Sequence, residues 1–176
     1  MNQSYLIAFF SFLVLLVLAL LFLYLHLRSV REELVTYWNS ILDKLRIRND
    51  MVPNLIETIR KYTTDEEKLI NEMIALRSKS WPMEKADAQK VNVELSLTQT
   101  LHEVWKLGQK IQALHLDTNF LSLKKDFHDL GQEIDGMTED YNRRVRSFNK
   151  RVGFIVIRPF TAFLKLHRFP VFEFEV

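Results

Sequence analysis

The sequence contains no cysteine, which excludes disulfides, thiol nucleophiles and thiolate metal sites. Only 4 glycines and 4 prolines occur among 176 residues, and this scarcity argues against an all-β or a disordered chain. The formal net charge is +2, so no overall field favours nucleic acid or a strongly acidic partner. The composition instead indicates an all-α protein.

Patterns that carry catalytic or metal chemistry are also missing. His102-Glu103 begins like the zincin H-E-x-x-H motif, but Lys106 stands where the second histidine is needed. None of the five histidines has a glutamate three residues before it, as a ferritin-like di-metal bundle requires. The glycines are scattered, so no phosphate-binding loop is expected. We therefore expect no enzymatic activity, cofactor, metal or small-molecule substrate.

One long apolar run is present, from Tyr5 to Leu27. As a helix it would extend roughly 34 Å, against about 30 Å for the hydrocarbon core of a bilayer. Tyr5 and Tyr24 stand near its ends, where interfacial aromatics are usual. The alternatives are a cleaved signal and a buried core helix. The run is longer than a signal's apolar region and no Lys or Arg precedes it, so a retained transmembrane helix over residues 5–27 is favoured.

The flanking charges predict an orientation. No Lys or Arg precedes the run, whereas Arg28 and Arg31 follow it directly. The positive-inside rule then leaves residues 1–4 as a short external N-terminus and places the rest of the chain in the cytoplasm.

Residues 28–152 carry apolar residues at helical spacing and are predicted to form an antiparallel bundle of long, coiled-coil-like helices. The clearest stripe runs from Phe120 to Val152. Trp81-Pro82 predicts a helix break, because proline inside a helix kinks it. Asp117 and Thr118 precede the last stripe and suit an N-cap.

Pro53 leaves two paths open. Asn49 and Asp50 could cap a new helix there, which would give a compact four-helix bundle. The apolar stripe keeps its phase across Pro53, however, and this favours one long helix from the membrane to about Ser80, with its membrane-proximal part forming a stalk or packing against other chains.

The tail, residues 153–176, is rich in phenylalanine with basic residues between. It suits either a basic amphipathic segment on a membrane or a C-terminal cap over the bundle end, and the cap is favoured. The last residues, from Phe172 to Val176, alternate as a short strand would.

Four short motifs follow the apolar run in order: Val52-Pro53-Asn54-Leu55, Ala75-Leu76-Arg77, Asn119-Phe120-Leu121-Ser122-Leu123 and Tyr141-Asn142-Arg143-Arg144-Val145-Arg146-Ser147-Phe148-Asn149. Together they resemble the signature of the LemA family of bacterial membrane proteins. The residues that carry this resemblance are predicted to take part in helix packing: Pro53, Asn54, Leu55, Arg77, Asn119, Phe120, Tyr141, Asn142, Val145 and Asn149.

The resemblance implies a single-pass protein of the bacterial cytoplasmic membrane with a long helical cytoplasmic domain and no established enzymatic activity. Some relatives are tied to shaping internal membranes, and family genes often lie beside genes for membrane zinc proteases. We therefore expect a self-associating scaffold that organises or remodels membrane or recruits partners. An adaptor for a membrane protease is the alternative.

Several residues allow both an ordinary and a functional interpretation. Asn142 and Asn149 share one helical face, where they are either exposed or locally bonded amides or amides that bond to a neighbouring helix, with Asn54 as a third candidate. Gly131 and Gly136 indicate a solvent-facing surface or the close approach of another helix. The basic residues suit solvated surface, or contact with anionic lipid or an acidic partner; they are Arg143, Arg144, Arg146, Lys150, Arg151, Arg158 and Arg168.

Overall fold

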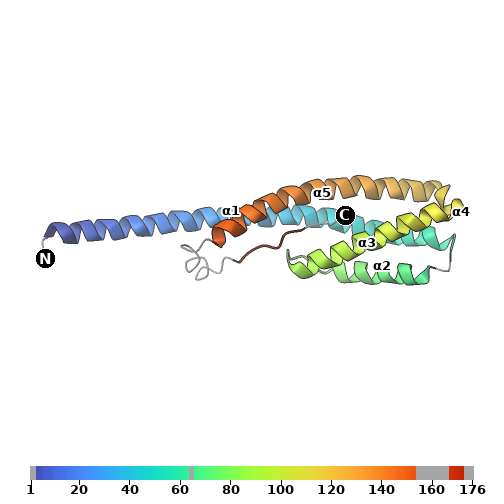
Figure 1. Cartoon of the computed structure of the whole chain (residues 1–176), viewed down its shortest axis with the longest axis horizontal. Coiled ribbons are helices and arrows are strands. Elements are labelled where there is room, and N and C mark those ends of the chain that lie inside the picture. The colour runs from blue at the N-terminus through green and yellow to red at the C-terminus, as the bar shows by residue number, and fades with distance from the viewer. Residues whose placement is uncertain (1–2, 64–65, 154–166, 173–176) are drawn as a thin grey trace. The chain divides into compact units, whose positions relative to one another are not determined.

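The structure is a computed structural model that describes residues 3–63, 66–153 and 167–172. Within these ranges the chain forms helices and no strand, which confirms the all-α prediction (Figure 1). The helices are α1 (Gln3–Arg60), α2 (Glu67–Ser80), α3 (Ala88–Lys110), α4 (Gln112–His115) and α5 (Thr118–Val152). The chain divides into two compact units, Met1–Thr36 and Tyr37–Val176, and the boundary falls inside α1.

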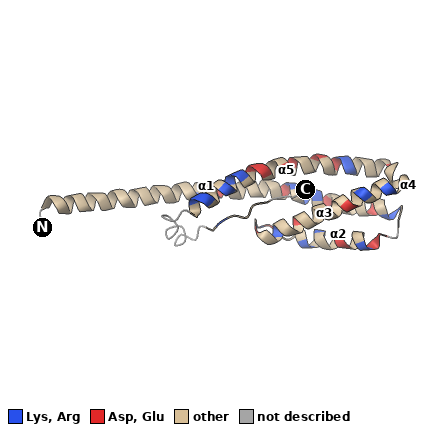
Figure 2. Ribbon diagram, in the orientation of Figure 1, with Lys and Arg blue, Asp and Glu red and all other residues tan. Residues whose placement is uncertain are grey.

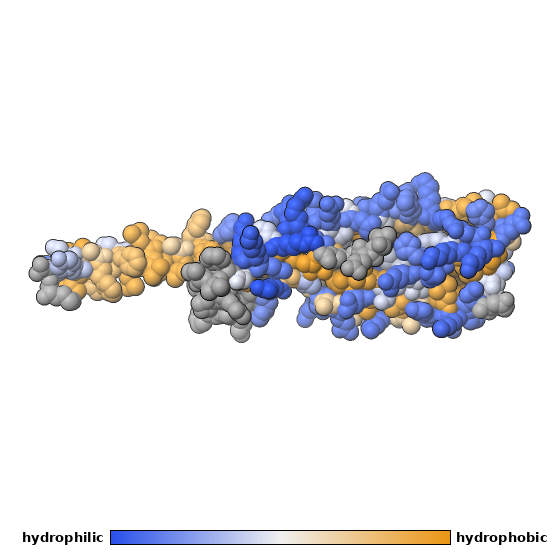
Figure 3. Space-filling model, in the orientation of Figure 1, coloured by the Kyte–Doolittle hydropathy of each residue, from blue (hydrophilic) through white to orange (hydrophobic). Residues whose placement is uncertain are grey.

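The first unit exposes most of the apolar run, although Leu27 at the end of the run is fully buried. Large hydrophobic side chains are exposed along it, among them Phe9 at 61%, Phe12 at 65% and Phe22 at 75%. Figure 3 shows this stretch as nearly continuous hydrophobic surface. Among the described residues, α1 is the one helix long and apolar enough to cross a membrane, and by length and composition alone a signal sequence would meet the same criterion.

In the second unit, the rest of α1 packs with α2, α3 and α5 as a four-helix bundle. Contacts at both ends fix the directions. Thr58 of α1 bonds Asn119 at the start of α5, while Lys44 pairs with Glu133 further along it, so α1 and α5 are antiparallel. Arg60 pairs with Glu67 at the start of α2 and Asn49 bonds Ser80 at its end, so α2 is antiparallel to α1 as well.

The core follows the predicted stripes. Val52, Leu55 and Ile59 of α1 are fully buried against α2, α3 and α5. On α5 the buried apolar positions repeat at the spacing of a bundle seam; they are Phe120, Leu123, Phe127, Ile134, Tyr141, Val145, Phe148 and Val152.

The predicted path after Pro53 was wrong in its end point. The helix passes Pro53, as the unbroken stripe indicated, but it stops at Arg60 and α2 returns alongside it. A reversal at Pro53 was wrong as well, although the four-helix bundle that it implied is the one that forms. The sequence places Thr63, Thr64 and Asp65 just beyond the stop, and residues of these types have only modest helix propensity.

The glycines of α3 and α5 differ sharply in surroundings. A Cβ at Gly108 would overlap the ring of Phe120, so this glycine admits close packing between α3 and α5. A Cβ at Gly131 or Gly136 would meet no described atom within 4 Å. The close approach considered for these two glycines therefore does not come from the described part of this chain.

Candidate functional site

Pro53 and Arg77, from two separate motifs, act on the same carbonyl group. Proline has no N–H, so the carbonyl of Asn49 loses the helix bond it would receive from residue 53. The Nε of Arg77 donates to that carbonyl oxygen at 2.7 Å. The guanidinium of Arg77 also lies over the ring of Trp81, 5.4 Å from its centroid. This contact explains how α1 continues through Pro53, because α2 supplies the missing donor.

A buried ionic cluster lies next to this junction. The carboxylate of Glu94 accepts from Arg48 at 2.5 Å and from Lys90 at 2.6 Å, and the side chains of all three are at most 6% exposed. The hydroxyl of Ser80 donates to Glu94 and accepts from Lys90 at 2.9 Å and from Asn49 at 2.9 Å. The cluster thus ties α1, α2 and α3 together.

The charges of this cluster lower the pKa of its carboxyl group. Burial would raise the pKa of Glu94, but Arg48, Lys90 and the Ser80 hydrogen bond outweigh burial and lower it below its ordinary value. Ser80 and Lys90 resemble a nucleophile and its base, yet the Ser80 hydroxyl is 0% exposed and already occupied by three partners. The arrangement is therefore suited to holding helices rather than to attacking a substrate.

The third motif joins the start of α5 to the end of α1. Asn119 donates to the hydroxyl of Thr58 at 2.7 Å. Asp117 caps α5 as predicted, since its carboxylate accepts from the N–H of Phe120 at 2.7 Å. The other oxygen of Asp117 accepts from the Tyr62 hydroxyl at 2.5 Å, and this bond lowers the pKa of Asp117.

Tyr141 and Val145 of the fourth motif lie in the core and are both 0% exposed. The ring of Tyr141 packs 5.9 Å from that of Trp38 on α1. The Tyr141 hydroxyl is buried and has no hydrogen-bond partner among the described residues. Burial raises the pKa of this phenol far above its ordinary value.

Asn142 and Asn149 are neither exposed nor locally bonded, and they do not bond a neighbouring helix either; both bond the backbone of the tail, contrary to both interpretations. Asn149 donates to the carbonyl of Phe169 at 2.8 Å and accepts from the Phe169 N–H at 3.0 Å. Asn142 makes the same pair of bonds with Phe172. The part of the tail that the structure describes, residues 167–172, therefore lies along α5 rather than over the bundle end (Figure 1, dark red). Glu173–Val176, most of the predicted short strand, lies outside the described residues.

Asn54 differs from the other two asparagines. Its side chain is exposed, and its backbone carbonyl accepts from the Thr58 hydroxyl at 2.8 Å. Leu55 beside it is fully buried. Among the motif asparagines, Asn119 rather than Asn54 bonds to another helix.

The basic residues of α5 cluster near its C-terminal end, after an acidic first half (Figure 2). Arg143 pairs with Asp140, and Arg144 stacks 4.5 Å from the ring centroid of Tyr37. Arg168 packs against Gly153, where a Cβ would collide with its guanidinium. The remaining residues of this set, Arg146, Lys150 and Arg151, are exposed, and Arg158 lies outside the described residues.

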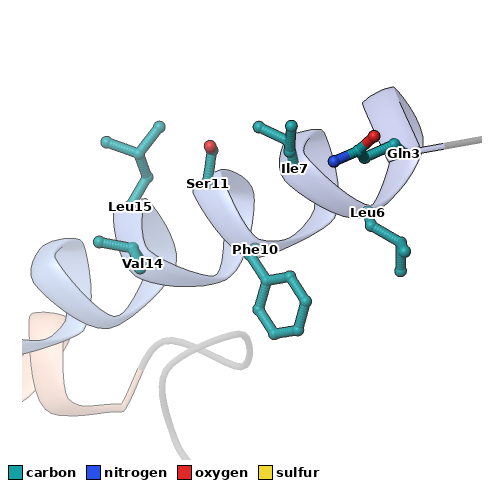
Figure 4. Close-up of a pocket in the computed structure, with 7 residues that line it drawn as sticks. All are labelled: Gln3, Leu6, Ile7, Phe10, Ser11, Val14 and Leu15. Atoms are coloured by element: carbon teal, nitrogen blue, oxygen red, sulfur yellow. The ribbon is translucent and has the colours of Figure 1, made fainter.

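The proposed anchor residues lie in the first unit. Tyr5 is 70% exposed and Tyr24 is half-buried. Arg28 pairs with Glu32 at 3.0 Å, and Arg31 is exposed. A hollow of about 620 Å³ follows Gln3 to Leu15 (Figure 4), but all of its lining comes from one helix. It is therefore the surface of an exposed helix and not a ligand site.

A true cleft lies between α3 and α5, with a volume of about 580 Å³. Trp105 and Phe127 form an aromatic wall with ring centroids 5.4 Å apart. His102, Lys124 and His128 add polar and basic side chains, Asp135 adds an acidic one, and Gly131 lies among the lining residues. In the described residues, no group of three or more His, Asp or Glu side chains is arranged to hold a metal.

Sequence reasoning missed the buried cluster. Arg48 occupies a position of the apolar stripe, between Leu45 and Val52, and a charge in that phase was the available signal. Nothing local marks Glu94 as the partner of Arg48, or Lys90 as the second cation bound to Glu94. A lysine and a glutamate four residues apart are ordinary on a solvent-facing helix. Trp38, the aromatic partner of the tail, was also missed.

The second unit matches a known protein family. Comparison with curated proteins gives no match. The family model described as the LemA family matches residues 37–176, the same range as the second compact unit. This range contains all four motifs and most of the chain, and so the chain belongs to the LemA family.

Proposed function

We propose that this protein is a non-enzymatic scaffold, anchored in the bacterial cytoplasmic membrane, that self-associates and thereby organises or remodels membrane or recruits partners. The observation that carries the proposal is the exposed apolar surface of α1, which a bilayer would cover. Arg28 and Arg31 follow it and support an external N-terminus with a cytoplasmic domain.

The motif residues support a structural role over a chemical one. Arg77 completes a helix at Pro53, Asn119 joins two helix ends, and Tyr141 fills core space. Such uses specify a shape. A domain of specified shape on a membrane anchor is what a scaffold requires.

Charge along α5 supports self-association. Its first half carries Asp126 and Asp135, together with Asp129 and Glu133, while its last turns carry Arg146, Lys150 and Arg151 (Figure 2). Asp129 and Glu133 also pair with Lys125 and Lys44 within the chain. Two copies placed side by side with a stagger would bring opposite charges together. The same basic end would also contact anionic lipid headgroups.

Size measurement tests the proposal. Sedimentation of the purified chain in mild detergent should give a mass that rises with concentration, and association should weaken with added salt because surface charges are screened. A monomer at every concentration, in detergent and in vesicles, would refute self-association.

An adaptor for a membrane protease is the second candidate, and the cleft between α3 and α5 favours it. Its aromatic wall suits a partner segment with apolar side chains, and Lys124 beside the wall suits an acidic group on that segment. A pull-down with the full-length chain that retrieves a membrane protease in an amount equal to that of the chain would support the adaptor. Replacing Trp105 with alanine should then abolish retrieval of the protease. Retrieval of the chain alone would support the scaffold.

A further inference from the structure

The surface that holds the tail has the properties of a site for an extended peptide. It comprises Asn142, Phe148 and Asn149 of α5 with Trp38 of α1, and we call it the amide surface. Each of its two asparagines bonds both the N–H and the carbonyl of one tail residue, as a neighbouring strand would. These bonds recognise extended backbone and not side chains.

The spacing of the asparagines matches an extended chain. Asn149 lies seven positions after Asn142 on the helix, a rise of about 10.5 Å. Phe172 lies three positions after Phe169, and in extended conformation this step also spans about 10 Å. Pro170 lies between the two bonded residues, so its missing N–H costs no bond. The tail therefore runs antiparallel to α5 in a defined register.

Side chains add specificity at the same two positions. Phe172 is 1% exposed, and its ring lies 5.9 Å from that of Trp38. The ring of Phe169 packs edge-on against Phe148 at 5.7 Å. The amide surface is thus complementary to a Phe-Pro-Val-Phe segment.

The connection to this segment is much longer than its own docking requires. Arg168 packs against Gly153, yet residues 154–167 connect them. A connection of that length can span up to roughly 45 Å. The tail makes identical contacts whether it comes from the same copy or from another copy. A copy's own tail is favoured only because it is covalently attached, which gives it a millimolar effective concentration at the amide surface.

Anchoring in one membrane removes much of that advantage. Copies assembled side by side hold each other's tails at comparable effective concentration, which is the condition for exchange of an identical element. We infer that the amide surface of one copy binds residues 167–172 of a second copy, so that tail exchange links the copies of the scaffold. This inference rests on the proposed self-association and names the contact that makes it.

A complementation experiment in vesicles tests the exchange with full-length chains. One chain, uniformly labelled with ¹⁵N, keeps the amide surface but carries Phe169→Ser and Phe172→Ser. The other, unlabelled, carries Asn142→Ala and Asn149→Ala with the photoreactive p-benzoylphenylalanine in place of Phe169. Both are placed in phosphatidylethanolamine–phosphatidylglycerol vesicles at high density, irradiated and digested for mass spectrometry.

Exchange predicts cross-linked peptides that join an unlabelled tail to a labelled α5, at least tenfold more abundant than in the same mixture diluted in detergent. The unlabelled chain with Asn142 and Asn149 intact serves as the control, and should shift cross-links toward its own α5. If vesicle-bound chains associate by size but cross-links remain within the unlabelled chain, tail exchange is refuted while the scaffold stands. If the chains are monomeric, both ideas fail together.

Equal mixtures of labelled and unlabelled chains without the alanine and serine substitutions give a second measurement that depends on no altered surface. Only the unlabelled chain carries p-benzoylphenylalanine in place of Phe169. Exchange predicts that mixed-isotope peptides increase with the number of chains per vesicle. A mixed fraction that stays at the level of the dilute sample would overturn the inference even if the substituted chains folded poorly.

Discussion

The guanidinium of Arg77 donates to the backbone carbonyl of Asn49 at 2.7 Å, and that carbonyl is the one that Pro53 leaves without its helix donor. Two motifs more than twenty residues apart in sequence therefore act on one hydrogen bond. The relationship makes a proline tolerable in the interior of a helix whose apolar stripe continues on both sides.

A double-mutant cycle tests this dependence. Arg77→Met should lower the free energy of unfolding by about 1–3 kcal/mol, because it leaves a carbonyl of α1 without its donor. In a Pro53→Ala background the alanine N–H supplies the bond, and the same substitution should cost about 1 kcal/mol less. Urea unfolding of the four chains gives the coupling.

The cycle also separates this bond from the other contacts of Arg77. Its stacking on Trp81 is lost in both backgrounds and cancels. Arg77 also lies 4.0 Å from the carboxylate of Asp50. An equal cost of Arg77→Met with and without Pro53 would show that the arginine acts through Trp81 or Asp50 instead.

The glycines offer a matched pair of substitutions. Gly108→Ala should destabilise the domain by about 2–4 kcal/mol, because the new methyl would overlap the ring of Phe120 and force α3 and α5 apart. Gly136→Ala should stabilise it by up to about 1 kcal/mol, since space is open there and alanine favours helix. Thermal unfolding followed by circular dichroism measures both. A loss at Gly136 would indicate that a second copy packs on that surface.

Periodicity predicted most of this fold. The stripe of α5, the N-cap at Asp117 and the break at Trp81-Pro82 depend on local patterns, and each lies where the sequence indicated. The reversal after Arg60 could not be predicted from the sequence, because no Gly or Pro marks it and the apolar stripe continues beyond it into α2. The sequence also did not predict which residues far apart in the chain contact each other.

The candidate site shows which contacts the sequence could not predict. Asn142 and Asn149 could be placed on one face of α5 from their spacing alone, but nothing local shows that the partner is Phe172 or Phe169. Glu94 likewise has an ordinary sequence neighbourhood, and only the bundle brings Arg48 to it. Residue type and period predict faces, whereas the partner across a face depends on tertiary packing.

Removing the charge of Glu94 should be costly. Glu94→Gln leaves Arg48 and Lys90 buried without their carboxylate, and we expect a loss of about 3–5 kcal/mol at neutral pH. The exposed Glu103→Gln, which loses only a surface pair with Lys106, should leave the unfolding midpoint unchanged. Equal effects of the two substitutions would contradict the role of the cluster.

The same residue predicts an acid dependence. The pKa of Glu94 is lower in the folded than in the unfolded chain, so its charge stabilises the domain above the unfolded pKa. That stabilisation is lost as pH falls through the folded pKa, in the range below about pH 4. Urea midpoints measured between pH 7 and 3 should fall less steeply for Glu94→Gln than for the unaltered chain. Parallel curves would show that other carboxylates dominate.

Two tyrosines predict opposite results for one substitution. Tyr141→Phe removes a buried hydroxyl that has no partner among the described residues, so stability should stay the same or rise by up to about 1 kcal/mol. Tyr62→Phe removes the bond to Asp117 and should lower the unfolding midpoint. The comparison uses identical chemistry at both sites. A loss at Tyr141 would reveal a partner for its hydroxyl, such as a bound water.

The orientation of the chain can be tested because it contains no native cysteine. We expect Ser4→Cys to react with a membrane-impermeant maleimide in intact spheroplasts, whereas Ser78→Cys, exposed on α2, should react only after permeabilisation. The reversed pattern would mean that the charges at Arg28 and Arg31 do not set the topology. A mature chain that lacks residue 4 by mass would identify the apolar run as a cleaved signal. These three results exclude one another. The labelling therefore decides which side of the membrane the domain faces, and the mass decides whether the hydrophobic part of α1 remains in the protein.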